Sequence, residues 1–271
     1  MRLLYRRAYG RFPSLRNPTT FDEKIQWYKL HYRKPVMATM ADKFAVRAYL
    51  EERGFGYLLN ELQHTYERVE DIDFAQLPQS FVLKATHGTN MNIICPDKSQ
   101  LDWEQSCQLM NSWLSTNHYQ VGREWAYKNI KPQIICEDYL ENKEYNDLID
   151  YKFYCYDGKP AVVWACTGRS SSDGVKYTAY DMDWQPISVN KGKPSNSFCV
   201  TMPDRFSDMQ NIATELSQGF PFVRVDLYSV ENKLFFGELT FYPDSGVVPF
   251  SPDHFNYFFG DLFQLSKCNE V

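Results

Sequence analysis

Two pairs of short apolar segments in the second half of the chain constrain the fold most strongly. Residues 151–156 and 160–166 flank Asp157-Gly158, a dipeptide that favours the two-residue turn of a β-hairpin. Residues 222–228 and 234–241 also alternate around a polar turn. Because hairpin turns join antiparallel strands, the sequence predicts antiparallel sheet after residue 150.

Helical segments are mixed with these strands. Apolar residues recur at helical spacing in 39–53, 102–117 and 205–218, and short buried strands are expected at 80–84 and 134–136. Hairpins dominate the later part of the chain, and no regular alternation of strands and helices occurs. The pattern therefore predicts an α+β fold rather than a doubly wound parallel sheet.

The last predicted hairpin carries a possible metal site. Alternation places Arg224 and Asp226 on one strand face, and a turn centred on Asn232 would set Asp226 opposite Glu238, with Cβ atoms about 5 Å apart. Two opposed carboxylates repel unless a divalent cation bridges them, and oxygen ligands without His or Cys suit Mg²⁺ or Mn²⁺. Arg224 would reach an anion held by that metal. A solvent-facing Arg–Asp pair explains the pattern equally well.

Two lysines and one strand end fit a nucleotide. Lys84 ends a predicted strand and opens into a loop of small and hydroxyl residues around Gly88, which suits a polyphosphate. Lys43 lies in the predicted helix 39–53. The strand at 134–140 turns polar and would offer backbone groups to a flat base. Taken alone, each lysine is more often a surface residue, and the polar stretch is more often an ordinary strand end.

In this order, these features resemble the ATP-grasp superfamily, and within it the TupA-like (teichuronopeptide-biosynthesis-like) branch. The matching stretches are FDEKIQWYKL, ADKFAVRAYLEERG, SFVLKATHG, GREWAYKNIKPQIICEDYL, DYKFYCYDGKP, GFPFVRVDLY and FGELTFYPDSG. The resemblance implies two α+β subdomains that clasp ATP between antiparallel sheets, after a shortened N-terminal region. The expected boundaries are 1–75 for that basic region, 76–140 for the small subdomain and 141–271 for the large one. Independently of the resemblance, the acidic and polar composition of residues 141–149 predicts a linker or hinge there.

The resemblance also implies roles for individual residues. The nucleotide-binding set would be Lys43, Lys84, His87, Gly88, Glu137, Asp138, Tyr139, Leu140 and Lys152. Within it the lysines would bind phosphates, the loop 86–92 would cover the triphosphate, and 137–140 would hydrogen-bond the adenine. Asp226 and Glu238 would hold Mg²⁺, and Arg224 would stabilise the acyl-phosphate and the tetrahedral intermediate. Arg169 is a further candidate for phosphate binding.

One residue departs from the pattern of the superfamily. Most ATP-grasp ligases have Glu-x-Asn on the second metal strand, whereas this chain has Glu238-Leu239-Thr240. A threonine hydroxyl is a weaker neutral ligand than an asparagine amide, so the number of metal ions stays open at this point.

The activity implied is that of an ATP- and Mg²⁺-dependent carboxylate–amine ligase. Its substrates would be a small-molecule or glycan carboxylate and an amine, as when an amino acid is joined to a sugar acid of a surface polysaccharide. A glycosyltransferase is the main alternative, because Asp71-Ile72-Asp73 and Asp181-Met182-Asp183 could ligate Mn²⁺ and a sugar diphosphate. A binding module that keeps only nucleotide affinity is a third reading.

Charge is distributed unevenly along the chain. Residues 1–50 carry a net charge of +8 and residues 51–271 carry −13, within a total of −5. The acidic body argues against a nucleic-acid partner. The cluster of Arg2, Arg6, Arg7, Arg11 and Arg16 is expected to meet an anionic acceptor or the inner membrane surface, with a solvated basic face as the alternative.

The remaining composition bounds the location. No apolar run reaches the roughly 18 residues that a membrane-spanning helix needs, and the start lacks the apolar core of a signal peptide. The seven cysteines contain no CxxC pair and read as reduced thiols. We therefore expect a cytoplasmic protein with peripheral contact at the inner face of the membrane.

Overall fold

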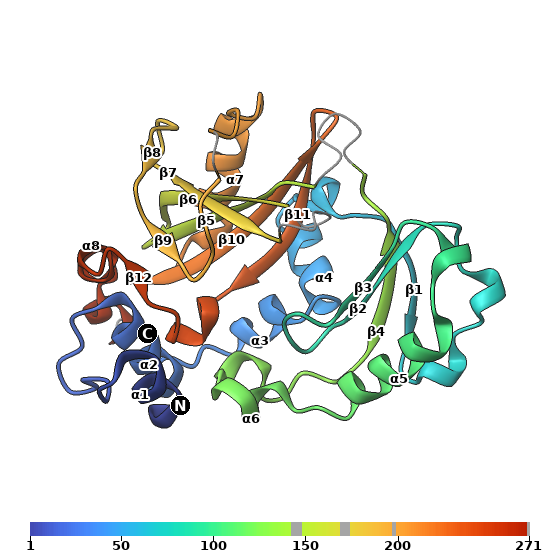
Figure 1. Ribbon diagram of the computed structural model, residues 1–271, viewed down its shortest axis with the longest axis horizontal. Helices are drawn as coiled ribbons and strands as arrows, with labels where there is room; N and C mark the ends of the chain where they lie inside the picture. Colours follow the sequence, from blue (N-terminus) through green and yellow to red (C-terminus); the bar gives the residue numbers. More distant parts are fainter. Residues whose placement is uncertain (142–147, 169–173, 197–198, 270–271) are drawn as a thin grey trace. The chain divides into compact units, whose positions relative to one another are not determined.

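The computed structural model describes residues 1–141, 148–168, 174–196 and 199–269 (Figure 1). Most of the expected hinge at 141–149, and Arg169, lie outside these residues. The chain divides into two compact units. Unit 1 comprises residues 1–33 and 141–271, and unit 2 comprises residues 34–140. Of the predicted N-terminal region 1–75, residues 1–33 belong to unit 1, and residues 34–75 belong to unit 2 together with the predicted small subdomain.

Unit 2 is built around a four-stranded antiparallel sheet with the order β1-β4-β2-β3. Its strands are β1 (Leu62–Tyr66), β2 (Phe81–Ala85), β3 (Asn92–Cys95) and β4 (Ile134–Asp138). Its helices are α3 (Val36–Ala41), α4 (Ala45–Glu52), α5 (Trp103–Leu114) and α6 (His118–Gly122). Strand β1 precedes residue 75 but pairs along β4, and this pairing explains why no boundary falls at that point.

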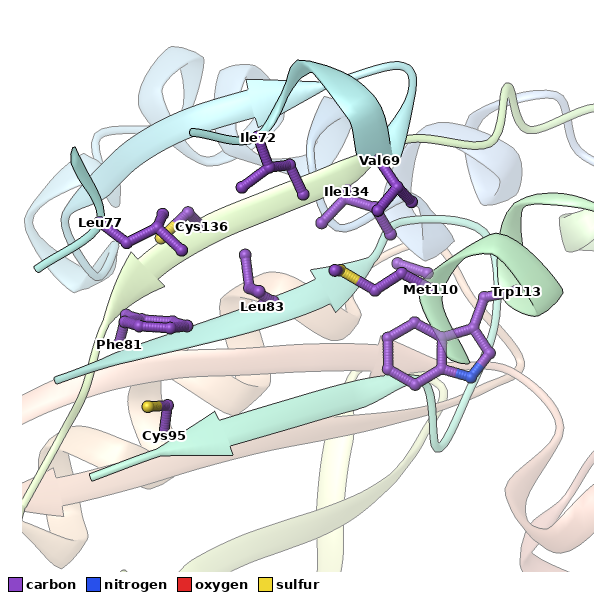
Figure 2. Packing of buried hydrophobic residues seen from close by; sticks show 11 residues of the cluster. Val69, Ile72, Leu77, Phe81, Leu83, Cys95, Met110, Trp113, Ile134 and Cys136 are labelled. Carbon is purple, nitrogen blue, oxygen red and sulfur yellow. The ribbon is translucent and has the colours of Figure 1, made fainter. Parts of the chain in front are cut away.

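One face of this sheet carries the core of unit 2 (Figure 2). Phe81 and Leu83 of β2 and Ile134 of β4 project from the sheet toward Met110 and Trp113 of α5. These side chains are buried because β2 and β4 alternate apolar residues on that face. Helix α5 contributes fewer residues than its sequence suggests.

Two helix predictions are corrected here. The helical spacing of apolar residues in 102–117 predicts that Leu109, Met110, Trp113 and Leu114 face inward, yet Leu109 is 43% exposed, whereas Met110 and Trp113 are buried. The predicted helix 39–53 is two helices that break at Asp42, whose carboxylate accepts a hydrogen bond of 2.8 Å from the backbone N–H of Phe44. A side chain that caps the backbone competes with a continuous helix.

Unit 1 is built around a six-stranded antiparallel sheet with the order β11-β10-β5-β6-β7-β8. Its strands are β5 (Asp150–Tyr156), β6 (Lys159–Thr167), β7 (Lys176–Tyr180), β8 (Pro186–Ile187), β10 (Phe222–Val230) and β11 (Lys233–Thr240). A small second sheet pairs β9 (Asn190–Lys191) with β12 (Phe250–Ser251). The helices are α1 (Arg2–Tyr9), α2 (Phe21–His31), α7 (Phe206–Ser217) and α8 (His254–Leu262).

Both predicted hairpins are present in this sheet. Asp157 and Gly158 join β5 to β6, and both have positive φ, as a type I′ turn requires. The predicted α+β architecture is confirmed, with antiparallel sheets in both units. No helix among the described residues is long and apolar enough to cross a membrane.

The two faces of the six-stranded sheet differ in what covers them. Helix α7 packs on the face that carries Phe153 and Cys155, whose thiol lies 3.8 Å from the carbonyl of Ala213. On the opposite face, the ring of Phe21 in α2 packs against Tyr154 and Phe222 at one end. The same face carries the polar side chains of Lys152, Arg224 and Asp226, and we call this part of it the polar face. It holds the candidate site.

Helix α2 lies in a segment where regular structure is not predicted. Its start is defined by a capping box, in which the Thr20 side chain accepts from the backbone of Glu23 and the Glu23 side chain reaches back to the backbone of Thr20. The sequence TFDE carries this signal, but the prolines on either side obscure it. The cap positions Phe21 against the sheet of unit 1.

Candidate functional site

The polar face of unit 1 brings four predicted site residues together. Asp226 on β10 is the direct partner of Glu238 on β11 and of Lys152 on β5. Arg224 lies two residues before Asp226 and shares its face. Asp226 is almost fully buried, whereas the Glu238 side chain keeps 29% of its surface exposed. The site therefore has one enclosed carboxylate and one that solvent reaches.

Arg224 connects these carboxylates. Its guanidinium holds Asp226 through two hydrogen bonds of 2.6 and 2.7 Å, in the fork geometry that suits a carboxylate. The Nη2 atom also donates to Glu238 at 2.7 Å and to the hydroxyl of Thr240 at 3.0 Å. That hydroxyl in turn donates to Glu238 at 2.9 Å. The arginine is thus fixed at the centre of the face.

Lys152 supplies a second cation. Its ammonium group lies 2.5 Å from a carboxylate oxygen of Asp226 and 2.5 Å from one of Asp150. Burial works to lower the pKa of Lys152, but the two carboxylates outweigh it and hold that pKa well above its ordinary value. Lys152 therefore stays charged at neutral pH.

The donor set fits a metal ion that arrives with a nucleotide. Asp226 and Glu238 present hard carboxylate oxygens, with the hydroxyl of Thr240 beside them. Among the described residues, no group of three or more His, Cys, Asp or Glu side chains is arranged to hold a metal ion. Mg²⁺ commonly takes one or two carboxylates and completes its shell with water and substrate phosphates, so a two-carboxylate site suits Mg²⁺ bound to ATP.

Unit 2 carries a second cluster of predicted residues. Glu137 on β4 is buried, and its two oxygens are held by different cations. Lys84 donates to one at 2.6 Å, and Arg47 of α4 donates to the other at 3.1 Å. Arg47 also donates to the backbone carbonyl of Asn60 at 2.8 Å. The carboxylate thereby sets the position of Lys84 at the end of β2.

Lys43 lies in the break between α3 and α4, next to the predicted phosphate loop. Its ammonium group donates to the carbonyl of Gly88, and its backbone N–H donates to the carbonyl of Thr86 at 3.2 Å. A Cβ on Gly88 would approach the sulfur of Met91 at 2.9 Å and the His118 ring at 3.0 Å. A side chain at this position would require Met91 or His118 to move, and Lys43 is tied to the backbone of the loop.

His87 contacts helix α5. Its Nε2 atom lies 2.9 Å from the carbonyl of Trp113 in α5, and the ring is buried. Burial lowers the pKa of His87, and the charge of Lys43 lowers it further. A neutral imidazole bound to helix α5 anchors the loop, and the predicted contact of His87 with a nucleotide stays a prediction.

The predicted adenine hinge is partly engaged within unit 2. The backbone N–H of Asp138 donates to the backbone carbonyl of Glu61 at 3.1 Å, and the Asp138 carbonyl accepts from the Asn60 side chain at 2.7 Å. The Asp138 carboxylate accepts from Gln63 at 2.6 Å. Tyr139 and Leu140 follow the end of β4 and are half-buried. The base-binding role of residues 137–140 stays a prediction.

Sequence reasoning missed two residues of these clusters. Arg47 stands four residues after Lys43, and that spacing in a predicted helix was the available signal. Asp150 belongs to β5 and shares the face of Lys152 by alternation, but it follows the polar stretch that was read as a hinge. Arg47 is revealed by its contact with Glu137, 90 residues away in the sequence. Asp150 is revealed by its contact with Lys152 on the same strand.

The two Asp-x-Asp sequences lie in local turns. Asp71 pairs with Arg68, and Asp73 accepts from the backbone of Ala75. Asp181 accepts from the backbone N–H groups of residues 183 and 185 at 3.0 and 2.7 Å. These hydrogen bonds account for the aspartates as turn residues.

Comparison with known proteins gives one family match. The model of the family described as TupA-like ATPgrasp matches residues 23–264 of this chain. No curated protein matches the sequence.

Several solved structures are similar to this one. D-alanine–D-alanine ligase from Bacillus anthracis, complexed with ATP, is 13% identical with a TM-score of 0.49 over 86% of this chain and 67% of that one. L-amino acid ligase from Bacillus licheniformis is 12% identical with a TM-score of 0.44 over 80% and 43%. D-Alanine–D-alanine ligase from Helicobacter pylori is 9% identical with a TM-score of 0.48 over 92% of this chain and 68% of that one. This chain thus spans about two thirds or less of the length of these proteins.

Proposed function

This chain belongs to the TupA-like ATPgrasp family, and we propose that it is an ATP- and Mg²⁺-dependent carboxylate–amine ligase. The reaction would pass through an acyl-phosphate. In the first step a carboxylate oxygen attacks the γ-phosphorus of ATP, and the bond to the bridging oxygen of ADP breaks. In the second step the amine attacks the acyl carbon, loses a proton and displaces phosphate.

The observation that carries this proposal is the arrangement around Asp226. Two cations, Arg224 and Lys152, contact one buried carboxylate, and a second carboxylate, Glu238, lies opposite it. Transfer of a phosphoryl group develops negative charge on oxygens, and fixed cations stabilise that charge without having to reorganise. Arg224 is proposed to contact the acyl-phosphate, and Lys152 a transferring phosphate.

Asp226 and Glu238 are proposed to hold the Mg²⁺ that accompanies ATP, and Mn²⁺ would use the same oxygen ligands. When bound, the metal ion would neutralise phosphate charge and orient the triphosphate. In unit 2, Lys43 and Lys84 are the proposed phosphate ligands, with the loop around Gly88 supplying backbone groups.

The proposed acceptor is a sugar acid of a surface polysaccharide or its precursor, joined to an amino acid or another amine. Support for this substrate class comes from the resemblance to the teichuronopeptide-biosynthesis-like branch of the superfamily. The activity itself can be tested without the natural acceptor, because ADP release with a panel of uronic acids and amines reports the first step.

The decisive experiment compares Asp226→Asn and Glu238→Gln with Asp208→Asn, which removes an exposed carboxylate of α7. The first two variants are expected to lose at least about 100-fold in ADP release while keeping their far-UV circular dichroism. The Asp208→Asn variant should match the unchanged protein. Normal turnover by both site variants would refute the metal assignment.

A binding measurement distinguishes the ligase from a glycosyltransferase. A ligand that binds only the folded state raises the melting temperature. Mg-ATP should therefore raise it, and UDP-sugars should not. A shift with UDP-sugars alone would refute the proposed function.

A further inference from the structure

Helix α1 has one buried side and one exposed apolar side. Tyr5 is fully buried and stacks on Tyr9 with ring centroids 4.4 Å apart, and the Tyr9 hydroxyl donates to the carboxylate of Asp22 in α2, which attaches the helix to unit 1. On other faces of the helix, Leu3 is 74% exposed and Leu4 is 41% exposed. Two exposed leucines on one short helix are not needed for the fold of unit 1.

Arginines accompany these leucines. The guanidinium groups of Arg2 and Arg6 lie 5.3 and 5.1 Å from the centre of the Phe12 ring, which is itself partly exposed. Arg7 is also exposed. Within the described part of the chain, no carboxylate forms an ion pair with Arg2, Arg6 or Arg7, whereas Arg11 is paired with Glu23. Three positive charges are therefore available for an external anion.

An exposed aromatic side chain lies beside these arginines. Phe12 follows α1 and is 45% exposed, and the guanidinium groups of Arg2 and Arg6 lie over its ring. Helix α8 packs against α1, because the side-chain amide of Asn256 donates to the hydroxyl of Tyr9 at 3.4 Å. We call Arg2, Leu3, Leu4, Arg6, Arg7 and Phe12 the N-terminal patch.

We propose that the N-terminal patch binds the surface of an anionic lipid bilayer. Arginine and exposed Leu or Phe side chains together are the composition of helices that lie in the membrane interface, where the apolar groups enter the headgroup boundary. A soluble polyanion would use the arginines but would leave the leucines in water. Net charges of +8 in residues 1–50 and −13 in the remainder favour approach with the arginines toward a negative surface.

Co-sedimentation of the full chain with vesicles tests this inference directly. The protein should pellet with vesicles of phosphatidylglycerol and phosphatidylcholine, and it should stay in solution with phosphatidylcholine alone. Raising the salt concentration should weaken the binding, because it screens the arginines. The measurement needs no ATP, so its result is independent of the proposed ligase activity.

Two pairs of variants separate the charged and the apolar contributions. Replacing both Arg6→Gln and Arg7→Gln should weaken binding to anionic vesicles about 30-fold, at roughly five-fold for each arginine. The matched control, Lys159→Gln with Lys233→Gln, removes two exposed cations at hairpin turns and should bind nearly as well as the unchanged protein. Replacing Leu3→Ser and Leu4→Ser should weaken binding about 10-fold, while Met202→Ser, at another exposed apolar residue, should not.

Three outcomes would overturn the inference. The first is an absence of sedimentation with anionic vesicles. The second is equal loss of binding in the arginine variant and its lysine control, which would indicate non-specific attraction. The third is loss in the arginine variant with none in the leucine variant, together with competition by soluble polyphosphate, which would identify a site for a soluble polyanion. Unchanged melting temperatures would exclude unfolding of the variants as the cause.

Discussion

Asp226 and Glu238 face each other because β11 contains one extra residue, Gly237. The turn between β10 and β11 has two central residues, Glu231 and Asn232, both with positive φ, as in a type I′ turn. Counted from this turn, Asp226 would face Gly237. The register set by the turn holds as far as Leu227, which pairs with Phe236. A bulge at Gly237 then shifts the register, so that Asp226 pairs with Glu238. The predicted pairing is correct, but the predicted turn centre at Asn232 is wrong.

Replacing Gly237→Ala should therefore disturb the site. An added Cβ would lie 3.0 Å from the backbone oxygen of Asp226 and 3.1 Å from the ring of Tyr228. We expect the free energy of unfolding in urea to fall by about 1–3 kcal/mol, and the stabilisation by Mg-ATP to decrease. Gly56→Ala is the control, because the closest contact of its added Cβ would be the movable side chain of Glu51 at 3.2 Å, with backbone no nearer than 3.7 Å. Equal tolerance of both substitutions would argue against the bulge as a constraint.

The hydroxyl group of Thr240 is expected to contribute more to stability and to metal binding than the shape of the side chain does. It accepts from Arg224 and donates to Glu238. Thr240→Val keeps the shape but leaves both partners short of one hydrogen bond, so the free energy of unfolding should fall by about 1–3 kcal/mol. A melting-temperature titration of Mg²⁺ at fixed ATP should also require more metal. Thr240→Ser retains the hydroxyl and should restore the wild-type titration; if it behaves like the valine variant, the hydroxyl is not the cause.

Lys152 should be essential for the stability of unit 1. Its ammonium group lies between the buried carboxylates of Asp150 and Asp226. Lys152→Met would remove the ammonium group that separates these two negative charges. Breaking a buried ion pair in this way should lower the free energy of unfolding by about 3–5 kcal/mol. Urea unfolding checks the value. Lys159→Met, at an exposed lysine in the same unit, should change stability by less than about 0.5 kcal/mol.

His87 should make the stability of unit 2 depend on pH. Because burial lowers its pKa in the folded state, the unfolded chain binds a proton more readily. The contribution of His87 to stability is therefore complete above the ordinary pKa of 6.5 and is lost as the pH falls from there toward the lower folded-state pKa. His87→Gln should reduce the difference in unfolding free energy between pH 7.5 and 5.5.

His64→Gln, which replaces an exposed histidine of β1, is the control for that comparison. It should leave the difference between the two pH values nearly unchanged. His118 is also buried enough for its pKa to be lowered, so the His87 variant should retain part of the pH dependence. An identical pH dependence in the His87 variant and the unchanged protein would refute the assignment.

Much of the fold follows from local patterns. The Asp157-Gly158 turn, the alternating strands β5 and β10, and the helix α7 that ends before Gly219 were all predictable, because turn chemistry and periodicity involve neighbouring residues. The break in 39–53 was not, because a capping aspartate in an otherwise helical pattern gives a weak signal.

The candidate site also follows in part from local patterns and in part from tertiary contacts. The sequence by itself determined which polar residues share a face: Arg224 with Asp226 on one strand, and Glu238 with Thr240 on the next. Only the tertiary structure decided which cation each carboxylate meets. Lys152 reaches Asp226 across 74 residues of sequence, and Arg47 reaches Glu137 across 90. Alternation assigns a side chain to a face, whereas such contacts depend on strand order, on a bulge and on helix packing, which no local pattern encodes.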